Sequence, residues 1–256
     1  MQLLTNKVVF LTGGSMGIGL ECAKAYAAEG ARVVIVAPDA GSVAGAINQL
    51  GPQHLGIVGD VSKVEDVKRA MEETIRTYGQ LDAIHNNAGI ASPSKPLDET
   101  TDDEWQELMD VNLRSLLFTT RFGIEALKKT QGTILNTSSL VGEIGQSNHA
   151  AYTATKGAIN ALTKSMALDY AAFKIRVNAV LPAGVWTDTL RKWGADQPNS
   201  GAINNYLKDI HPLGYCPEGD EIADACVFLL SDKARFITGA NLPVSGGAEL
   251  GYRRNF

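Results

Sequence analysis

Tyr152 and Lys156 are four residues apart, a spacing that places two side chains on the same face of a helix. Oxidation of a secondary alcohol needs a base that takes the hydroxyl proton as hydride leaves the carbon, and reduction needs the same group as an acid. A phenol serves in both directions if a neighbouring cation lowers its pKa from about 10. The pair therefore fits acid–base chemistry at an alcohol oxygen, although solvated surface neighbours share the same spacing.

Two adjacent serines precede this pair and offer a hydroxyl for the reacting oxygen. Ser138 and Ser139 follow directly after an apolar, β-branched run at Thr133–Thr137. If that run is a strand of a parallel sheet, both serines lie at its carboxyl edge, where such sheets hold ligands. Either hydroxyl could orient a substrate by hydrogen bonding, so the spacing alone leaves two candidates.

A glycine-rich turn joins the first apolar run to the first helical segment. After Thr12 come Gly13, Gly17 and Gly19 in the pattern G-x-x-x-G-x-G, and a helix is expected to run on to about Glu29. Glycines let the chain turn sharply and approach a ligand, while free N–H groups at a helix start attract a pyrophosphate. No Lys-Ser or Lys-Thr follows the last glycine, which excludes a Walker-type loop. A dinucleotide site is favoured over a turn that binds no ligand.

The elements that must position these residues alternate between strands and helices. The expected strands are Val8–Leu11, Arg32–Val36, Leu55–Val58, Ala83–Asn87, Thr133–Thr137, Arg176–Leu181 and Asn241–Val244. Amphipathic helical segments separate them, which favours a parallel sheet covered on both faces and joined by right-handed crossovers. The sequence predicts an α/β, Rossmann-like fold with a doubly wound parallel sheet of about seven strands.

Helix starts and loop signals complete this outline. Ser62 with Glu65 and Thr101 with Glu104 each predict a capping box at a helix N-terminus. Residues 188–211 interrupt the alternation with glycines, a proline and aromatic residues, so we expect a loop or small helical lid over a site there. No repeat or linker divides the chain, and residues 1–256 are expected to form a single domain.

Composition excludes several classes of function. The 256 residues are 45% hydrophobic, and 23 basic against 28 acidic residues give a net charge of −5. Without a basic cluster, neither nucleic acid nor an anionic membrane is an expected partner. The first seven residues do not resemble a signal peptide, and no apolar run is long enough to span a membrane. Three cysteines without a C-x-x-C pair argue against disulfides and structural zinc, so a reducing, cytoplasmic location is expected.

In combination, these motifs resemble the short-chain dehydrogenase/reductase family. The resemblance rests on T-G-x-x-x-G-x-G at 12–19, N-N-A-G at 86–89, Asn112, the Ser139 region, Y-x-x-x-K at 152–156 and the segment 182–187. These motifs cover nearly the whole chain in the family's order. The resemblance implies a seven-stranded dinucleotide-binding fold, an oxidoreductase with a nicotinamide cofactor and a small-molecule substrate, and a homotetramer or homodimer.

The same resemblance implies a role for each catalytic candidate. Tyr152 becomes the acid–base group, Lys156 lowers its pKa and binds ribose, and the family's spacing selects Ser139 over Ser138 to orient the substrate. Asn112 would hold a water that links the lysine to solvent, or it is a satisfied core amide. The implied cofactor contacts are Gly13, Ser15, Met16, Gly17, Ile18, Gly19, Ala37, Asp39, Asp60, Val61, Asn87, Ala88, Gly89, Tyr152, Lys156, Val185 and Thr187.

The choice between NAD and NADP falls at the end of the second strand. Family members that favour NAD carry an acidic residue there for the ribose 2′-hydroxyl, and NADP-dependent members carry an arginine nearby. This chain has Ala37 and Pro38 there, and Ser15 and Met16 in the glycine turn, so it satisfies neither rule. Asp39 could accept from the ribose and repel a 2′-phosphate, or be an exposed turn acid. The absence of a positioned cation favours NAD, with NADP as the alternative.

Two further positions depart from the family pattern. Ala183 stands where a glycine is usual, so Gly184 is expected to absorb a turn of positive φ, and Val185 and Thr187 are expected to contact the carboxamide. His85 stands where the family generally has an aliphatic strand residue. We expect a hydrogen-bonded sheet histidine and no metal site, because no ligating residue flanks it in the sequence.

Closer resemblance points to one branch of the family. Segments 129–132, 138–146, 185–187 and 246–252 look like those of L-fucose dehydrogenases, a branch that includes the type-14 17β-hydroxysteroid dehydrogenase. Besides Ser139 and Tyr152, Gln146 could bind a second substrate hydroxyl and Trp186 could stack on a pyranose ring, or both have only structural roles. The expected substrate is a secondary or hemiacetal alcohol such as an aldose. The alternatives are a hydroxysteroid or 3-oxoacyl-thioester reductase and a dinucleotide-sensing protein without turnover.

Overall fold

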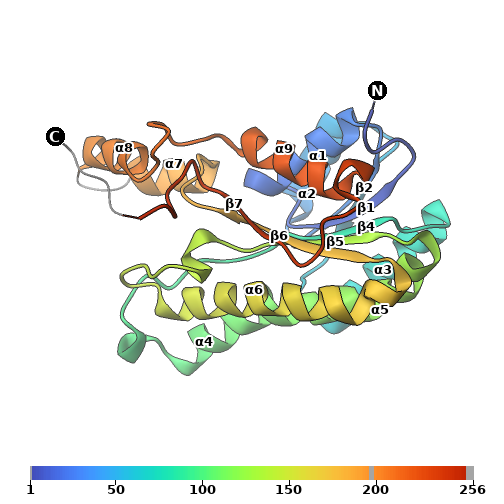
Figure 1. The fold of residues 1–256 in the computed structure, drawn as a ribbon, viewed down its shortest axis with the longest axis horizontal. Coiled ribbons are helices and arrows are strands. Elements are labelled where there is room, and N and C mark those ends of the chain that lie inside the picture. The colour runs from blue at the N-terminus through green and yellow to red at the C-terminus, as the bar shows by residue number, and fades with distance from the viewer. Residues whose placement is uncertain (1, 196–198, 252–256) are drawn as a thin grey trace.

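The computed structural model describes residues 2–195 and 199–251, and its centre is a parallel sheet of seven strands (Figure 1). The strands are β1 Val8–Thr12, β2 Arg32–Ala37, β3 Leu55–Val58, β4 Ala83–Asn86, β5 Thr133–Thr137, β6 Arg176–Pro182 and β7 Asn241–Val244. Their order in the sheet is β3-β2-β1-β4-β5-β6-β7. Each predicted strand is present, with ends that differ by at most one residue, so the doubly wound α/β fold is confirmed.

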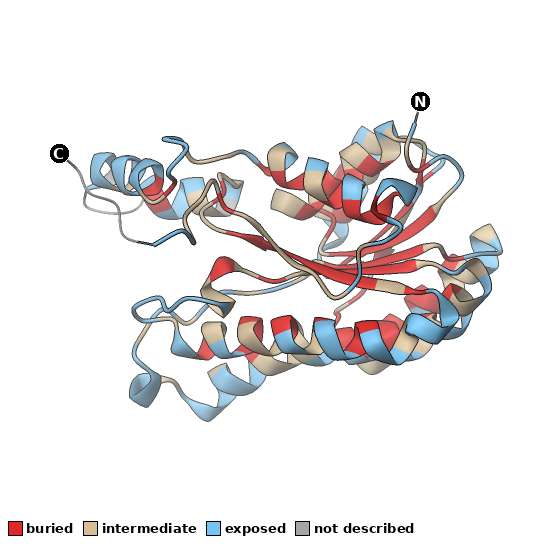
Figure 2. Ribbon diagram, in the orientation of Figure 1, coloured by how far each residue is buried: buried red, intermediate tan, exposed pale blue. Residues whose placement is uncertain are grey.

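Helices cover both faces of this sheet because successive strand residues point to opposite sides. Val9 and Leu11 of β1 pack in the core beneath α1 (Gly17–Ala28), α2 (Ala40–Leu50) and α9 (Gly219–Leu230). Val8 and Phe10 pack toward α3 (Val64–Tyr78), α5 (Ser115–Thr130) and α6 (Ala150–Tyr170). Figure 2 shows the central strands buried almost throughout, with the buried side of each helix toward the sheet. Of the described helices, none combines the length and apolarity that a membrane crossing requires.

The two predicted helix starts have different outcomes. Thr101 caps α4 (Asp102–Met109) as predicted, since its backbone N–H donates to the Glu104 carboxylate at 2.8 Å and its hydroxyl accepts from the Glu104 N–H at 3.3 Å. The capping box at Ser62 is wrong, because α3 begins one residue later with Lys63 as its N-cap. The Ser62 N–H and hydroxyl both donate to one carboxylate oxygen of Asp60, at 2.9 and 2.7 Å. The Ser62 donors therefore belong to the turn that precedes the helix and not to a cap.

The segment 188–211 contains two short helices beyond one end of the sheet (Figure 1), α7 (Asp188–Ala195) and α8 (Ser200–Asp209). Residues 196–198 of the predicted lid lie outside the described residues. The expectation that Gly184 absorbs a positive φ is wrong, because its φ lies outside the left-handed region. Gly184 instead lies close to α8, where a Cβ would be 2.9 Å from Leu207 Cδ2 and the leucine side chain would have to shift.

Candidate active site

The sheet has a switch point between its neighbouring strands β1 and β4. The chain leaves β1 toward β2 and β3 on one side, and leaves β4 toward β5, β6 and β7 on the other. Doubly wound sheets bind ligands at the carboxyl ends of the strands at such a point. Here the glycine turn after β1 meets the N-N-A-G segment after β4. Asn87 Nδ2 donates to the carbonyls of Thr12 and Gly13 at 3.1 and 3.2 Å, and the Ala88 N–H donates to Thr12 Oγ1 at 3.1 Å.

The glycine turn has the shape and the free donors that a pyrophosphate needs. Gly13 and Gly17 have φ values of 65° and 54°, in the region that favours glycine. A Cβ on Gly13 would lie 2.8 Å from Ala88 Cα, so the two segments touch only because this residue has no side chain. Within the described residues, α1 starts without a side-chain cap at Met16 and without an acidic residue in its first turn. Its first N–H groups are therefore open to an anion, which fits the pyrophosphate of a dinucleotide.

Helix α6 presents Tyr152 and Lys156 on one face. The Lys156 Nζ lies 5.6 Å from the centroid of the Tyr152 ring and donates to the Thr137 carbonyl at 2.9 Å. Lys156 is buried, whereas Tyr152 is partly buried. The Ser139 hydroxyl lies close enough to the Tyr152 phenol to act on its pKa in the lowering direction. The three side chains therefore meet at the carboxyl edge of β5.

The two adjacent serines face different parts of this cluster. The buried Ser138 hydroxyl donates to the Lys156 carbonyl at 3.0 Å, which ties the end of β5 to the backbone of α6. Ser139 Oγ lies 3.4 Å from the Pro182 carbonyl, which accepts from it, and 3.4 Å from the Val141 N–H, which donates to it. Of the two hydroxyls, that of Ser139 is the one that acts on the pKa of the phenol.

Asn112 lies in a single π-helical turn, Asp110–Arg114, between α4 and α5. Its Oδ1 accepts from the Ile90 N–H at 2.8 Å, and its Nδ2 donates to the Ile90 carbonyl at 2.8 Å and to Thr155 Oγ1 at 3.1 Å. A Cβ on Gly89 would lie 3.3 Å from Asn112 Oδ1 and 3.5 Å from Lys156 Nζ. The amide thus fixes the backbone after β4 directly beside the lysine. Single π-turns of this kind are frequent at functional sites.

Comparison with known proteins agrees with this geometry. The sequence profile described as Enoyl-(Acyl carrier protein) reductase matches residues 13–249. An L-fucose dehydrogenase from Bos taurus is 40% identical over 249 residues, which cover 97% of this chain and 92% of that protein. The chain is a short-chain dehydrogenase/reductase.

Solved structures of similar proteins share the fold over nearly the full length. A 3-ketoacyl-(acyl-carrier-protein) reductase from Brucella melitensis complexed with NADH has a TM-score of 0.89 and 33% identity, over 96% of this chain and 99% of that one. A Thermoplasma acidophilum aldohexose dehydrogenase has a TM-score of 0.89 and 32% identity, over 100% and 98%. This short-chain dehydrogenase/reductase is an NAD(P)-dependent oxidoreductase of the alcohol dehydrogenase/ketoreductase type.

The electrostatics of this short-chain dehydrogenase/reductase differ in one respect from the sequence-based expectation. Burial lowers the pKa of Lys156 to about 8. Burial also raises the pKa of Tyr152, and the hydrogen bond from Ser139 acts in the opposite direction without cancelling it. In this structure burial sets the direction of the phenol pKa, and the role of Lys156 in lowering it stays a prediction. The serine hydroxyl is the neighbour that favours the phenolate.

The adenosine end of the expected cofactor site lies beside the end of β2. Ala37 is buried, and Asp39 is the exposed N-cap of α2, with Oδ1 accepting from the Ser42 N–H at 2.7 Å. This backbone hydrogen bond holds the pKa of the Asp39 carboxyl below its usual value. The Ser42 hydroxyl also donates to Ser15 Oγ in the glycine turn at 3.1 Å. Asp39 is thus a turn acid, as one alternative held, yet its carboxylate is linked through Ser42 to the turn.

Most of the other cofactor candidates lie in or beside the fold's interior, whereas the substrate candidate Gln146 does not. Val61 and Val185 are buried, and Asp60 bonds Ser62 as described above. A Cβ on Gly17 would lie 3.4 Å from Thr187 Cγ2, so Thr187 borders the glycine turn. Gln146 is exposed in the loop between β5 and α6, and no described contact joins it to the cluster.

Trp186 lies at a different place from the phenol. It lines a cavity of about 300 Å³ between Gly17 of α1 and Gly219 of α9. The Arg191 guanidinium lies 4.9 Å from the centroid of the Trp186 ring and covers one of its faces. Ser139 and Tyr152 are not among the described residues that line this cavity.

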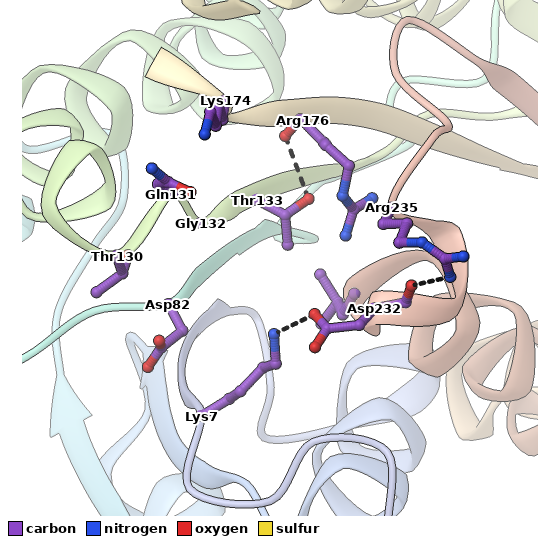
Figure 3. A pocket seen from close by; sticks show the side chains of 11 residues that line it. Lys7, Asp82, Thr130, Gln131, Gly132, Thr133, Lys174, Arg176, Asp232 and Arg235 are labelled. Atoms are coloured by element: carbon purple, nitrogen blue, oxygen red, sulfur yellow. Dashed lines mark hydrogen bonds and ion pairs between the residues drawn. The ribbon is translucent and has the colours of Figure 1, made fainter.

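A second pocket lies at the opposite edge of the sheet (Figure 3). It is bordered by the residues before β1, β5 and β6, where the Lys7 ammonium pairs with Asp232 at 2.8 Å and the Thr133 hydroxyl donates to the Arg176 carbonyl at 3.2 Å. Parallel sheets hold their ligands at the carboxyl edge, so this amino-edge pocket is not the active site.

Sequence reasoning missed several residues that shape the site. The Thr137 carbonyl accepts a hydrogen bond from Lys156 Nζ. The Thr137 hydroxyl lies 2.9 Å from His85 Nε2 and 3.2 Å from Asn87 Oδ1. The His149 ring stands edge-on to the Tyr152 ring, with centroids 6.3 Å apart. A histidine three residues before a helical tyrosine was the available signal for the second contact. A threonine that ends a strand carries no comparable signal.

His85 is a hydrogen-bonded sheet histidine, as predicted, with its Nδ1 2.9 Å from the Tyr26 hydroxyl. No ligating residue flanks it in the sequence, but the fold brings two close to it. Cys22 and Cys226, distant in the sequence, lie against it in the fold, with ligand atoms of all three residues within 4.8 Å of one another.

Proposed function

We propose that this protein is an NAD-dependent dehydrogenase that oxidises a secondary or hemiacetal hydroxyl of an aldose such as L-fucose. The observation that carries the proposal is the cluster on α6 and β5. The Ser139 hydroxyl neighbours the Tyr152 phenol and acts to lower its pKa, and the buried Lys156 ammonium lies 5.6 Å from the phenol ring. With Asn112, these residues are the proposed catalytic set.

Each of these side chains has a task that follows from its position. When bound, the nicotinamide accepts the hydride from the carbinol carbon. The Ser139 hydroxyl holds the substrate oxygen by a hydrogen bond, and Tyr152 takes the hydroxyl proton on its phenolic oxygen. Lys156, anchored on the Thr137 carbonyl, supplies the positive charge beside the phenolate and binds the ribose. Asn112 holds the Ile90 backbone, and with it the lysine side of the site, in place.

The proposed dinucleotide would lie across the switch point. Its pyrophosphate would meet the N–H groups at the start of α1, and its adenosine would lie beside Asp39 and Ser15. A carboxylate at this position accepts from a ribose hydroxyl and repels a 2′-phosphate, which supports NAD over NADP. The remaining proposed contacts are Gly13, Met16, Gly17, Ile18, Gly19, Ala37, Asp60, Val61, Asn87, Ala88, Gly89, Val185 and Thr187.

Similarity supports the choice of substrate. The L-fucose dehydrogenases of four mammals are 39–40% identical to this chain, and the aldohexose dehydrogenase has the same fold. Contacts of Gln146 and Trp186 with the sugar stay predictions, as does closure of the segment 188–211 over it. The second candidate is reduction of a 3-oxoacyl thioester, which the similar 3-ketoacyl-(acyl-carrier-protein) reductase favours.

Steady-state kinetics with a substrate panel tests this proposal. L-Fucose, other aldoses, a hydroxysteroid and a 3-oxoacyl thioester are each assayed with NAD or NADP. We expect the highest kcat/KM for an aldose with NAD. A preference for the thioester would overturn the substrate and leave the catalytic residues in place.

A matched pair of variants tests the catalytic set. Tyr152→Phe should lower kcat by about 10²–10⁴-fold while the Kd for NAD is unchanged, because only proton transfer is removed. Tyr170→Phe, at the other end of α6, should retain wild-type turnover. Undiminished turnover of Tyr152→Phe would refute the assignment.

We further infer a homotetramer or homodimer in the cytoplasm. Apolar side chains are exposed on the helices of one face, namely Trp105 of α4, Leu117 of α5 and Leu168 of α6. Exposed apolar surface of this kind marks association sites. The free state of Cys22, Cys216 and Cys226 suits a reducing compartment.

A further inference from the structure

Three metal-ligating side chains from distant parts of the sequence converge inside the molecule. Cys22 lies on α1, His85 on β4 and Cys226 on α9, and all three residues are fully buried. Helices α1 and α9 lie side by side on one face of the sheet (Figure 1), so the cluster is enclosed between these helices and the central strands. Both thiols are free. Two thiols and an imidazole are the donor groups that thiophilic d¹⁰ cations prefer.

A chain of hydrogen bonds sets which nitrogen of His85 faces the thiols. Asn87 Nδ2 donates to the Thr12 and Gly13 carbonyls, which turns Asn87 Oδ1 toward Thr137. The Thr137 hydroxyl donates its proton to that oxygen at 3.2 Å, so it accepts from His85 Nε2 at 2.9 Å. The proton of the neutral ring is therefore on Nε2, and the lone pair is on Nδ1. Metal-binding histidines are held in the same way, by a hydrogen bond to the nitrogen that does not ligate.

The charge of the cluster indicates which cation it suits. Two thiolates and a neutral imidazole around a divalent cation carry no net charge, as a fully buried site requires. A monovalent cation would leave a buried negative charge. The Tyr26 hydroxyl, 2.9 Å from Nδ1, donates to the lone pair of that nitrogen, so it must turn away when an ion binds there.

We propose that Cys22, His85 and Cys226 form a structural zinc site through their two Sγ atoms and Nδ1. Zinc bonds of about 2.3 Å to sulfur and 2.0 Å to nitrogen require ligand atoms about 3.5 to 4 Å apart, so the cluster contracts by about 1 Å on binding. Each thiol that still carries a proton releases it to solvent as its sulfur–zinc bond forms, up to two protons per ion. The ion joins α1, which follows the glycine turn, to α9 and the central sheet.

Metal content of the intact protein tests the site. The full-length chain, produced in zinc-supplemented medium and purified under reducing conditions, should hold about one zinc per chain. Protein produced with cobalt instead should show thiolate-to-cobalt charge-transfer absorption and the d–d bands of a tetrahedral ion. Less than about 0.1 metal per chain in both preparations, or a cobalt spectrum without the thiolate band, would overturn the proposal.

Variants and refolding identify the ligands. Cys22→Ser and Cys226→Ser should lose the cobalt bands, and His85→Gln should weaken cobalt binding at least about tenfold. The matched variant Cys216→Ser should keep them. Because buried variants can fail to fold, wild-type chain is also refolded with zinc or with chelator. Zinc should raise the midpoint of thermal unfolding and release up to two protons per ion, and an unchanged midpoint without proton release would overturn the site.

Discussion

Asp39 combines a structural and an electrostatic task at one carboxylate. It caps α2 through the Ser42 N–H, and it lies next to the glycine turn through the bond from Ser42 to Ser15. Asparagine caps helices as well as aspartate does but carries no charge. Asp39→Asn therefore separates the two tasks.

For Asp39→Asn we expect kcat/KM with NADP to rise about fivefold, because a like-charge repulsion of about 1 kcal/mol from a 2′-phosphate is removed. Thermal unfolding should be nearly unchanged because the cap is retained. The two cofactors are compared with the same substrate in steady-state assays. Equal NADP kinetics in the variant and the wild type would show that Asp39 takes no part in cofactor choice.

Burial of the Lys156 ammonium lowers the free energy of unfolding by an amount that depends on pH. Its pKa is about 8 in the folded protein, against about 10.4 in an unfolded chain. Between these two values the unfolded chain binds more protons, so the contribution of Lys156 to the free energy of unfolding rises with pH. Below pH 8 the lysine is charged in both states and its full cost is present.

The free energy of unfolding of Lys156→Met should therefore exceed that of the wild type by the largest amount below pH 8. The difference in unfolding free energy between the two should shrink by about 3 kcal/mol as the pH rises to about 10.4. Urea unfolding across this range measures it, with Lys164→Met, an exposed lysine of the same helix, as the control. A difference that stays constant with pH would contradict the buried charge.

At the scale of elements, the shape of the glycine turn depends on its contact with the segment after β4. Gly13 has φ of 65°, and a Cβ there would meet Ala88 Cα at 2.8 Å. Gly13→Ala should lower the free energy of unfolding by about 2 kcal/mol and weaken NAD binding at least about tenfold. Urea unfolding and cofactor titration measure the two effects.

Gly45 provides the opposite case within α2. A Cβ there would meet nothing within 4 Å, so Gly45→Ala should raise the free energy of unfolding by about 0.5–1 kcal/mol and leave cofactor binding unchanged. If both glycine variants lost stability equally, the contact with Ala88 would not be the cause.

The sequence predicts helices, strands and pairs of nearby residues better than it predicts which distant residues meet in the fold. The strands could be found because residues buried on both faces give unbroken apolar runs, as in Val8–Thr12. Tyr152 and Lys156 could be paired because one helix fixes their spacing. The cap at Ser62 failed because the Asp60 side chain competes for the same donors, which no helix pattern shows. The meeting of Cys22, His85 and Cys226 depends on how α1, β4 and α9 pack, so spacing along the chain could not reveal it.

At the scale of the whole molecule, the helical face with exposed apolar residues is the proposed site of association between chains. Leu117 is 50% exposed on α5. If copies of the chain associate there, a buried aspartate would be unpaired in the interface, and Leu117→Asp should shift the particle toward the 27.3 kDa of one chain. Light scattering of both proteins at equal concentration measures this, and an unchanged mass would place the interface elsewhere.

The pairing of β1 has a consequence for the chain as it leaves the ribosome. β1 pairs with β2, and its other edge pairs with β4, which follows it by more than 70 residues. Until β4 has been made, that open edge exposes the unpaired backbone of an apolar strand that can recruit another nascent chain. Since the glycine turn is completed by contacts from the residues after β4, cofactor cannot protect this early stage. Slow synthesis between β3 and β4 is therefore the step at which aggregation competes most directly with folding.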